Sequence, residues 1–431
     1  MPKRATKRGA ERTPIGGSYD VIICGASFAG LTVARQLAGS GARTLLLDRY
    51  EIGERQTSAC GIPTSWLRAM GLEASARQEF HTLVIHTPHG TSRYKLPWSF
   101  TTFDYRELCD LLFADCDCEF ETAAVSGQRP GEGDEIAVET DRGTVSAPLV
   151  VDALGWKRVL AGNAYQPPDA PLSRGLEVHP PGSGQDMEIW IDRRYVPAGY
   201  GWSFPARDEV RVGVGSFDPR FHVKRTTVLL AEDLGRDAVR YQGNWIPHKL
   251  RRATEGNVFF VGDSAGHCLP LTAEGIRTAF YFAIALGEEL RAVVEGRKDR
   301  AAALRDYAAF SDAHEWKYRW MLRAQRAVPR LPARAQRALV ATVGVERLVR
   351  GAGEPRLVAE FEHMGEVAGQ EFEERFEAAS VRGIAAEGGR ELVEEGAEVV
   401  TEAASAAVEE LQRRWFDGKA ANVGDVAAGL Y

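Results

Sequence analysis

The residues with the clearest chemical potential lie in a glycine-rich turn at 25–30, which follows an apolar run at 21–24. Leu31 to Leu37 then have helical spacing, and a second apolar run, Thr44 to Leu47, ends at Asp48. Backbone N–H groups at the start of such a helix bind a pyrophosphate, and an acid about 20 residues further on accepts hydrogen bonds from a ribose. The spacing predicts a dinucleotide site formed by Gly25, Ala26, Ser27, Ala29, Gly30 and Asp48.

Ser27 occupies the position of the second glycine in the usual fingerprint. Serine is small, and its hydroxyl could itself donate a hydrogen bond to a phosphate. Arg49, directly after Asp48, is assigned to the same site. The alternative is an ordinary strand-turn-helix unit in which Ser27 only caps the helix.

A second set of candidates follows a buried strand at 257–261, which ends in Gly262 and Asp263. An acid at the carboxyl end of such a strand is well placed to accept hydrogen bonds from ribityl or ribose hydroxyls. A long helix begins after residue 275, and its N-terminus could stabilise the anion that forms on an isoalloxazine ring during reduction. The residues assigned to the cofactor here are Gly262, Asp263, Pro270, Glu274, Gly275 and Ile276.

Three aromatic residues with period two, Tyr200, Trp202 and Phe204, fall on one face of an expected strand. They could form the wall of a site for an apolar or planar ligand, although an aromatic ladder in a protein core has the same spacing. Cys60, followed by Gly61, could bring a thiol close to a flat cofactor, or it could be an inert buried cysteine. Arg106, in a helix expected over 103–111, could reach a cofactor phosphate or remain solvated.

The elements that must position these residues alternate between two kinds. Short strands separated by turns at 120–125, 135–139 and 144–146 predict a small meander, and Val125 is assigned to the cofactor site. Residues 149–153 return as a buried strand. Several alternating runs at 172–218 without helices between them predict an antiparallel sheet that could wall a pocket.

The composition of the 431-residue chain fits a protein with a sizeable core, because 44% of its residues are hydrophobic. A formal charge of −7 without an obvious basic face does not favour nucleic acid as a partner. The six cysteines have no zinc-like spacing, so we expect no metal and reduced thiols in a cytoplasmic protein. Residues 1–18 lack the apolar core of a signal peptide and are expected to be a disordered basic leader. No apolar run reaches the roughly 20 residues needed to span a bilayer.

The C-terminal region is expected to be helical and polarised in charge. Basic residues dominate 317–350, where Trp320 lies between them and Trp316 directly precedes them. Acidic residues dominate 354–431. The basic stretch could lie on an anionic membrane surface, or it could be a solvated face that pairs with the acidic tail. Residues 384–414 have the spacing of an amphipathic helix for self-association or partner binding.

With these segments in view, the sequence resembles the FAD-dependent geranylgeranyl reductase family, within the p-hydroxybenzoate hydroxylase-like (group A) flavoprotein superfamily, over residues 18–310. Three segments carry the resemblance: the glycine-rich turn with Asp48, the stretch 261–276, and the pattern Pro197-x-x-Tyr200-x-Trp202-x-Phe204-Pro205. The first two are shared across the superfamily. The third resembles the reductases in particular, where it lines the cavity for an isoprenoid chain.

The resemblance implies FAD as the cofactor, with Arg106 near it and Cys60 in a loop beside the flavin. Ser58 and Ala59 replace the Lys-Pro of the family's loop, and Leu154 stands where the larger group has an acid associated with FAD and NADPH. The electron donor is therefore left open between NADPH and ferredoxin.

Together these observations predict an α/β fold, with a Rossmann-type (glutathione reductase-like) FAD domain, an inserted antiparallel-sheet substrate domain and a C-terminal helical extension. The expected boundaries are 1–18 for the leader, 19–171 with 251–310 for the FAD domain (part of 61–100 near the substrate side), 172–250 for the substrate domain and 311–431 for the extension.

The predicted function is reduction of C=C bonds of an isoprenoid or similar apolar substrate by hydride transfer from reduced FAD. Tyr200, Trp202 and Phe204 would hold the substrate. Cys60, Tyr200 and Trp202 are the candidate catalytic residues, and Cys60, Tyr200 or water would donate the proton. We expect a lipid or other apolar small molecule as the partner, in the cytoplasm or at the membrane periphery. The same fold would serve an FAD-dependent monooxygenase or halogenase, and a non-catalytic FAD-fold scaffold is a third alternative.

Overall fold

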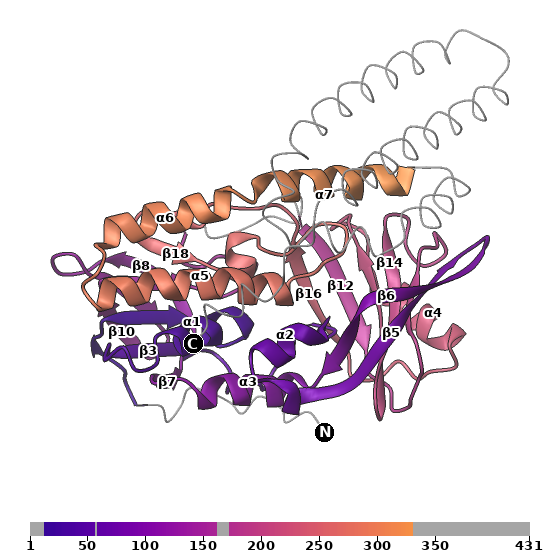
Figure 1. The fold of residues 1–431 in the computed structure, drawn as a ribbon, viewed down its shortest axis with the longest axis horizontal. Helices are drawn as coiled ribbons and strands as arrows, with labels where there is room; N and C mark the ends of the chain where they lie inside the picture. The colour runs from indigo at the N-terminus through magenta and orange to yellow at the C-terminus, as the bar shows by residue number, and fades with distance from the viewer. Residues whose placement is uncertain (1–12, 57, 162–171, 331–431) are drawn as a thin grey trace, which may run out of the picture.

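The computed structural model describes residues 13–56, 58–161 and 172–330. The expected helix at 384–414 and most of the basic stretch at 317–350 lie outside them. Figure 1 shows a sheet-and-helix body that carries the glycine-rich turn, beside a second, larger sheet.

The first sheet has six strands in the order β17-β18-β11-β2-β3-β7, and all of its pairs are parallel except β17 with β18. Its apolar side chains alternate between two faces. One face packs against the helices α1, α3 and α5, and the other packs against a small four-stranded sheet. The elements are β2 (Val21–Cys24), β3 (Thr44–Asp48), β7 (Glu119–Thr122), β11 (Leu149–Asp152), β17 (Thr254–Glu255), β18 (Val258–Phe260), α1 (Phe28–Gln36), α3 (Tyr105–Ala114) and α5 (Ile276–Val294).

The small sheet contains β8 (Val125–Pro130), β9 (Ile136–Thr140) and β10 (Gly143–Ala147), so the expected meander strands at 135–139 and 144–146 are confirmed. The expected first strand at 120–125 was wrong, because residues 119–122 form β7 of the six-stranded sheet and β8 begins at Val125. Its fourth strand, β1 (Gly17–Ser18), corrects the expectation of a leader that is disordered through residue 18. β1 pairs in parallel with β10, and Ile15 N–H donates to the carbonyl of Arg142 at 2.9 Å. The polar local sequence did not predict this strand, because β1 is ordered by pairing with β10, which is far away in the sequence.

The larger sheet has eight strands in the order β16-β12-β15-β14-β13-β5-β6-β4. Its pairs are antiparallel except β13 with β5, which run in parallel. The long hairpin of β5 and β6 extends from the body in Figure 1. The strands are β4 (Gly61–Pro63), β5 (Ala76–Thr87), β6 (Gly90–Phe103), β12 (Leu172–Val178), β13 (Met187–Trp190), β14 (Gly199–Ala206), β15 (Glu209–Ser216) and β16 (Gln242–Pro247).

The two faces of this sheet differ in what covers them. Val210, Val212 and Val214 of β15 pack with Leu230 of α4 (Lys224–Asp233) in one apolar cluster. The opposite face carries the expected aromatic row on β14, because side chains alternate along a strand. This second face is the one available to a ligand site.

The remaining helices connect the two sheets. α2 (Thr64–Ala69) and the short η1 (Glu73–Ser75) lie between β4 and β5, and η2 (Gly262–Ala265) follows β18. α6 (Arg300–Asp312) runs along α5, and α7 (Glu315–Ala327), which ends in η3 (Val328–Arg330), continues toward the larger sheet (Figure 1). None of the helices in the described part of the chain has the length and apolarity to cross a membrane.

Candidate cofactor and substrate site

The turn after β2 is one that only glycine can form at two positions. Gly25 has a φ of +111°, and a Cβ there would lie 2.2 Å from the carbonyl oxygen of Ala153. A Cβ on Gly30 would lie 1.8 Å from the carbonyl oxygen of Gly25. Because α1 packs this closely on the turn, its first N–H groups point at the space beyond the carboxyl end of β2.

Asp48 and Ser27 complete this turn. The Asp48 carboxylate accepts hydrogen bonds from the N–H of Ala26 at 2.8 Å and of Tyr50 at 2.9 Å. Burial raises the pKa of Asp48, and these two bonds oppose that rise. Ser27 is the N-cap residue of α1, but its side chain makes no capping hydrogen bond. Its hydroxyl accepts a hydrogen bond from the Tyr105 hydroxyl at 3.0 Å. The structure therefore brings the fingerprint residues and Asp48 together.

Asp263 lies in η2, immediately after β18. Gly262 has a φ of +65°, and its N–H donates to Nδ1 of the buried His267 at 3.2 Å, which fixes the turn. Burial raises the pKa of Asp263 to about 6, while Arg251 opposes the rise. Among the described residues, none donates a hydrogen bond to the Asp263 carboxylate. Asp263 is therefore a partly buried acceptor suited to a hydroxyl-bearing ligand.

The loop before α5 joins the two sheets. Leu271 and Ala273 adopt left-handed φ values of +66° and +52°, and the N–H of Leu271 donates to the Gln325 side chain of α7 at 2.7 Å. The Tyr200 hydroxyl of β14 donates to the carbonyl of Thr272 at 2.8 Å. These contacts hold the start of α5 close to the aromatic face of the larger sheet.

Gly275 is the N-cap of α5, and a Cβ there would lie 3.9 Å from Oδ1 of Asp263. Glu274 forms a bidentate ion pair with Arg277, with one N–O distance of 2.8 Å. The structure thus brings the set 262–263 and the set 270–276 to one place.

The aromatic row on β14 is a continuous surface. Ring centroids are 6.1 Å apart for Tyr200 and Trp202 and 6.5 Å apart for Trp202 and Phe204. The Trp202 ring lies over β15, where a Cβ on Gly213 would meet it at 2.2 Å. Trp202 Nε1–H donates to Glu177 of β12 at 3.2 Å. The three expected side chains are therefore neighbours on one face.

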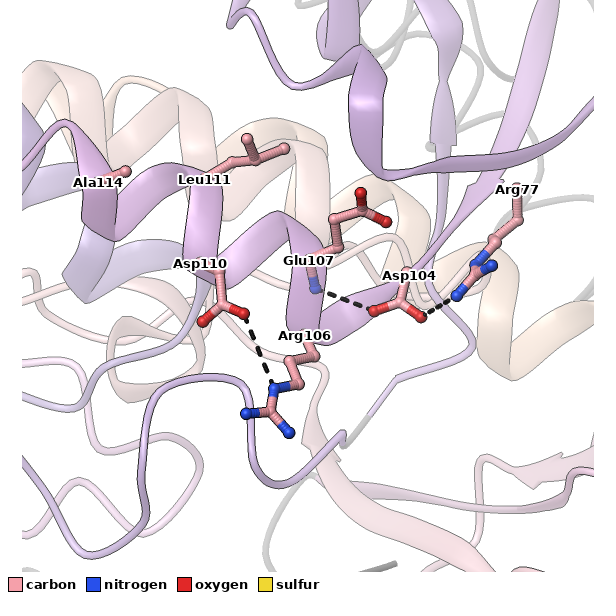
Figure 2. Close-up of a pocket in the computed structure, with 7 residues that line it drawn as sticks. All are labelled: Arg77, Asp104, Arg106, Glu107, Asp110, Leu111 and Ala114. Atoms are coloured by element: carbon pink, nitrogen blue, oxygen red, sulfur yellow. Dashed lines mark hydrogen bonds and ion pairs between the residues drawn. The ribbon is translucent and has the colours of Figure 1, made fainter. Parts of the chain in front are cut away.

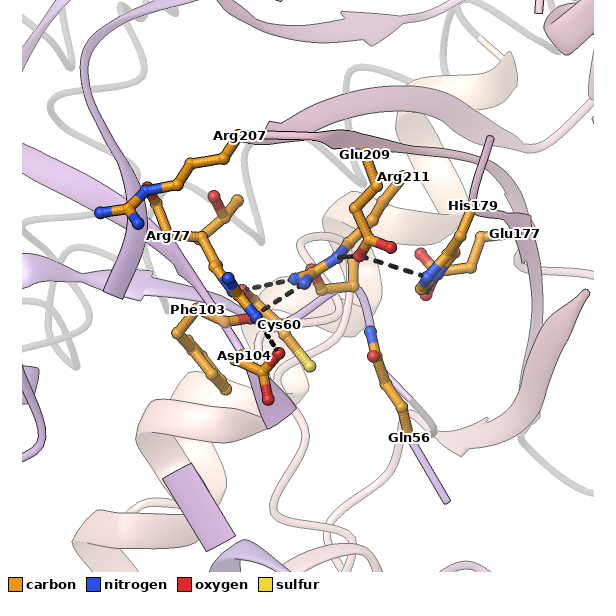
Figure 3. A network of polar contacts seen from close by, with 12 residues as sticks. Gln56, Cys60, Arg77, Phe103, Asp104, Glu177, His179, Arg207, Glu209 and Arg211 are labelled. Carbon is orange, nitrogen blue, oxygen red and sulfur yellow. Dashed lines mark hydrogen bonds and ion pairs between the residues drawn. The ribbon is translucent and has the colours of Figure 1, made fainter. Parts of the chain in front are cut away.

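Cys60 is fully buried and has a left-handed φ of +52°. Burial raises the pKa of its thiol well above the ordinary value, so the thiol is protonated at neutral pH. Arg211 of β15 holds this loop against the sheet, donating to the carbonyls of Ala59 at 2.8 Å, Cys60 at 3.2 Å and Phe103 at 3.0 Å (Figure 3).

Of three further predicted cofactor residues, Arg49 follows Asp48 and opposes the rise of its pKa. Arg106 and Val125 make no hydrogen bond or ion pair with these groups among the described residues. The Arg106 side chain is 68% exposed and lies 3.7 Å from Asp110 on its own helix, beside a shallow pocket of about 350 Å³ (Figure 2). Arg49 is exposed, with its guanidinium over the Tyr50 ring. Val125 begins β8 in the small sheet. Their roles in binding remain predictions.

Glu177, His179 and Arg211 were not identified from the sequence as site residues. The available signal was a charged residue between valines, as in Val210-Arg211-Val212, because such a residue lies on the opposite face of the strand from the apolar core. Some of their partners are two residues away, as for Glu177 with His179 and Arg211 with Glu209. The contact between Glu177 and Trp202 joins two strands and has no local signal.

These features fit a bound FAD. The Gly25 and Gly30 turn leaves room for a pyrophosphate at the start of α1, and Asp48 ends the adjacent strand. Asp263 supplies an acceptor that no described residue satisfies. A parallel sheet with this turn, a second carboxylate after β18 and a facing sheet with an aromatic row define an FAD-dependent oxidoreductase.

Comparisons with known proteins narrow this class. No protein-family model matches the chain. Over 328 residues the chain is 26% identical to digeranylgeranylglycerophospholipid reductase 3 of Methanosphaera stadtmanae, covering 68% of this chain and 83% of that protein. A 141-residue stretch is 33% identical to the chloroplastic geranylgeranyl diphosphate reductase of Oryza sativa, covering 30% of each chain.

Among solved structures, a geranylgeranyl bacteriochlorophyll reductase-like protein from Thermoplasma acidophilum has the same fold. Its TM-score is 0.69 at 18% identity, and the match covers 81% of this chain and all of that one. Together with the sequence relatives, it confirms that the chain resembles the geranylgeranyl reductase family of FAD-dependent flavoproteins.

Proposed function

We propose that this chain reduces C=C bonds of an isoprenoid chain carried by a lipid or other apolar molecule. The sequence relatives are named for reductases of digeranylgeranylglycerophospholipid and of geranylgeranyl diphosphate. The observation that carries the proposal is the aromatic row of β14, which the bond from Tyr200 to Thr272 ties to the loop before α5. An extended apolar chain could lie along this row within reach of the cofactor site.

FAD, when bound and reduced, would supply the hydride. Gly25, Gly30 and the start of α1 would hold its pyrophosphate, with Asp48 and Asp263 accepting hydrogen bonds from its hydroxyl groups. Free N–H groups at the start of α5 would stabilise negative charge on the reduced cofactor. Trp202 and Phe204 would orient the substrate and exclude water.

The test is an anaerobic single turnover. The purified yellow protein is reduced with dithionite and mixed with a geranylgeranyl lipid, and flavin absorbance is followed with product mass. We expect reoxidation without oxygen and a gain of two hydrogens for each double bond reduced. A reduced flavin that reoxidises only when O2 is admitted, with oxygen found in the product, would contradict the proposal.

That contradicting outcome would support the monooxygenase alternative. The fold is also shared with an anhydrotetracycline hydroxylase from Streptomyces rimosus, with a TM-score of 0.57 at 20% identity and coverage of 78% of this chain and 75% of that one. A colourless protein that does not take up FAD would instead support the scaffold alternative.

We also propose a peripheral contact with an anionic membrane through the basic stretch, as a source of the lipid substrate. In its described part, Arg319, Arg323, Arg326 and Arg330 are exposed at helical spacing, beside Trp320. The electron donor stays open between NADPH and ferredoxin, and each is tested by mixing it with the oxidised protein under anaerobic conditions.

A further inference from the structure

A carboxylate lies buried beside the aromatic row. Glu177 of β12 is 4% exposed and shares a face of the sheet with Trp202, since both residues pair with Gly213 of β15. One carboxylate oxygen accepts the Trp202 indole N–H at 3.2 Å. The other lies 2.9 Å from Nε2 of His179, which is also buried.

His179 connects Glu177 to a second carboxylate. Its Nδ1 lies 3.6 Å from Glu209 of β15 and 3.5 Å from the side-chain amide of Gln242. The imidazole therefore has a carboxylate on each side, and it can accept a proton at one nitrogen while it releases a proton from the other. The oxygen of the Gln242 amide is buried without a partner among the described residues, so rotation of this amide could accommodate either protonation state.

Glu209 leads to the surface of the sheet. Its side chain is 20% exposed, and its carboxylate contacts Arg211 at 3.1 Å and Arg240 at 3.2 Å. Arg240 is 43% exposed. The series of contacts thus extends from solvent at Glu209, through His179, to Glu177 (Figure 3). Glu177 in turn contacts Trp202.

We propose that Glu209, His179 and Glu177 form a proton relay that delivers a proton from solvent to the Trp202 face of the larger sheet. The inference rests on the proposed function, because reduction of a C=C bond consumes one proton for each hydride. It gives Glu177 and His179 a role in the chemistry and adds a proton source to the candidates Cys60, Tyr200 and water.

In the proposed reduction the π bond of the substrate would break, and one carbon would form a C–H bond with a hydride that reduced FAD, when bound, would supply. The other carbon forms a C–H bond with a proton that leaves the Glu177 carboxyl group. His179 then gives its Nε2 proton to Glu177 and takes another at Nδ1 from the Glu209 side, where water supplies it.

A purely structural role explains this arrangement less well. A buried carboxylate is costly to desolvate, and an apolar pair or a neutral acceptor for the Trp202 N–H would hold the same strands together. The same sheet contains a second carboxylate and imidazole pair, Glu188 with His86 at 2.6 Å, on the opposite face. This second pair provides a matched control.

The test compares Glu177→Gln and His179→Gln with Glu188→Gln. Glu177→Gln and His179→Gln each keep a polar side chain in place, but the amide cannot pass a proton on as a carboxylate or an imidazole can. In the anaerobic single turnover we expect each to slow reoxidation by the lipid by about 100-fold, the scale of one proton-transfer group. FAD affinity and dithionite reduction should be unchanged, and Glu188→Gln should react like the wild type.

A solvent isotope comparison separates a relay from a structural contact. In D2O the wild type should reoxidise measurably more slowly than in H2O, and His179→Gln should show a smaller difference between the two solvents. If Glu177→Gln and His179→Gln keep the wild-type rate, the relay is wrong while the proposed function stands. If the wild-type protein itself does not reoxidise with the lipid, both are overturned.

A second measurement does not depend on turnover. In protein labelled with ¹⁵N-histidine, the His179→Gln variant identifies the resonance of the His179 Nε2 proton. A relay open to water requires this buried proton to exchange within the mixing time in D2O, and Glu209→Gln should slow that exchange. Protection that lasts for hours in the wild type would overturn the proposal.

Discussion

At the scale of single residues, Asp263 shows how a predicted binding residue can lower the stability of the protein. Burial raises the pKa of Asp263 to about 6 from an ordinary value of 3.8, and no described residue donates a hydrogen bond to its carboxylate. Folding therefore favours the protonated form. A ligand that donates hydrogen bonds to the ionised carboxylate would reverse this preference, which links the charge of Asp263 to cofactor binding.

The free energy of unfolding should reveal this cost in the cofactor-free protein. The folded state holds the proton of Asp263 more tightly than the unfolded state does. The contribution of Asp263 to the free energy of unfolding is therefore greatest below about pH 4, and it declines as the pH rises to about 6. The loss is at most about 3 kcal/mol, from about 1.4 kcal/mol for each pKa unit. Asp263→Asn should remove this part of the pH dependence in urea titrations, whereas Asp312→Asn, on an exposed position of α6, should not.

The same carboxylate predicts a pH dependence of FAD binding. The ionised form is the acceptor, so wild-type affinity should fall as the pH drops through about 6. Asp263→Asn should bind FAD roughly tenfold more weakly at pH 7.5, the scale of one hydrogen bond to a charged group, and should show little change between pH 5 and 7.5. Flavin fluorescence quenching measures both. Equal affinity of variant and wild type at pH 7.5 would show that FAD does not contact Asp263.

At the scale of elements, α1 packs so closely on the glycine-rich turn that no side chain fits between them at Gly30. Gly30→Ala would place a Cβ 1.8 Å from the Gly25 carbonyl, so the helix must move away from the turn. We expect loss of FAD binding and a stability decrease of about 2 kcal/mol or more, the scale of overpacking. Gly127→Ala in β8 is the control, because its Cβ would meet an atom only at 3.9 Å. Thermal unfolding and flavin content measure the result.

The position of Trp202 depends on a neighbouring strand without a side chain. Gly213→Ala would place a Cβ 2.2 Å from the Trp202 ring and displace it, whereas a Cβ on Gly175 would meet its nearest atom at 3.6 Å. We expect Gly213→Ala to slow reoxidation by the lipid at least tenfold while FAD content stays normal, since a misplacement of about 1 Å in a reactive geometry can cost about 100-fold in rate. Gly175→Ala should react nearly as fast as the wild type. Equal rates for both variants would place the substrate elsewhere.

Elements with local signals could be predicted from the sequence. The expected strands at 21–24 and 44–47 are β2 and β3, because continuous apolar runs bounded by turns are typical of buried parallel strands. The helix expected over 103–111 is α3, and its N-cap Asp104 accepts a hydrogen bond from the N–H of Glu107 at 2.9 Å. The glycine positions and Asp48 were predicted from the spacing of one strand-turn-helix-strand unit, and Asp263 from its place after a buried strand. Their contacts with FAD stay predictions.

Elements that depend on distant pairing could not be predicted in this way. β5 pairs with β13, about 100 residues away, and nothing in the local pattern at 76–103 indicates that partner. Glu177 and Trp202 likewise meet across β15. A contact of this kind depends on strand register, which a single sequence leaves open.

At the scale of the whole molecule, one exposed surface is basic although the net charge of the chain is negative. The chain carries −7, yet the exposed side of α7 and η3 presents Arg319, Arg323, Arg326 and Arg330. α7 also contacts the loop before α5, since Gln325 accepts the Leu271 N–H. A basic face so close to the proposed lipid site favours contact with an anionic bilayer, from which the substrate could be taken up.

Vesicle binding tests this arrangement with charge-matched variants. Each basic residue near an anionic surface contributes about 1 kcal/mol, so Arg319→Glu with Arg323→Glu should lower binding to vesicles containing phosphatidylserine by at least tenfold. Arg43→Glu with Arg129→Glu, two exposed positions on the side of the small sheet, changes the net charge equally and should bind like the wild type. Because the attraction is screened, wild-type binding should also fall as salt rises from 0.05 to about 0.5 M. If both double variants lose binding equally, net charge governs the interaction and α7 is not the contact surface.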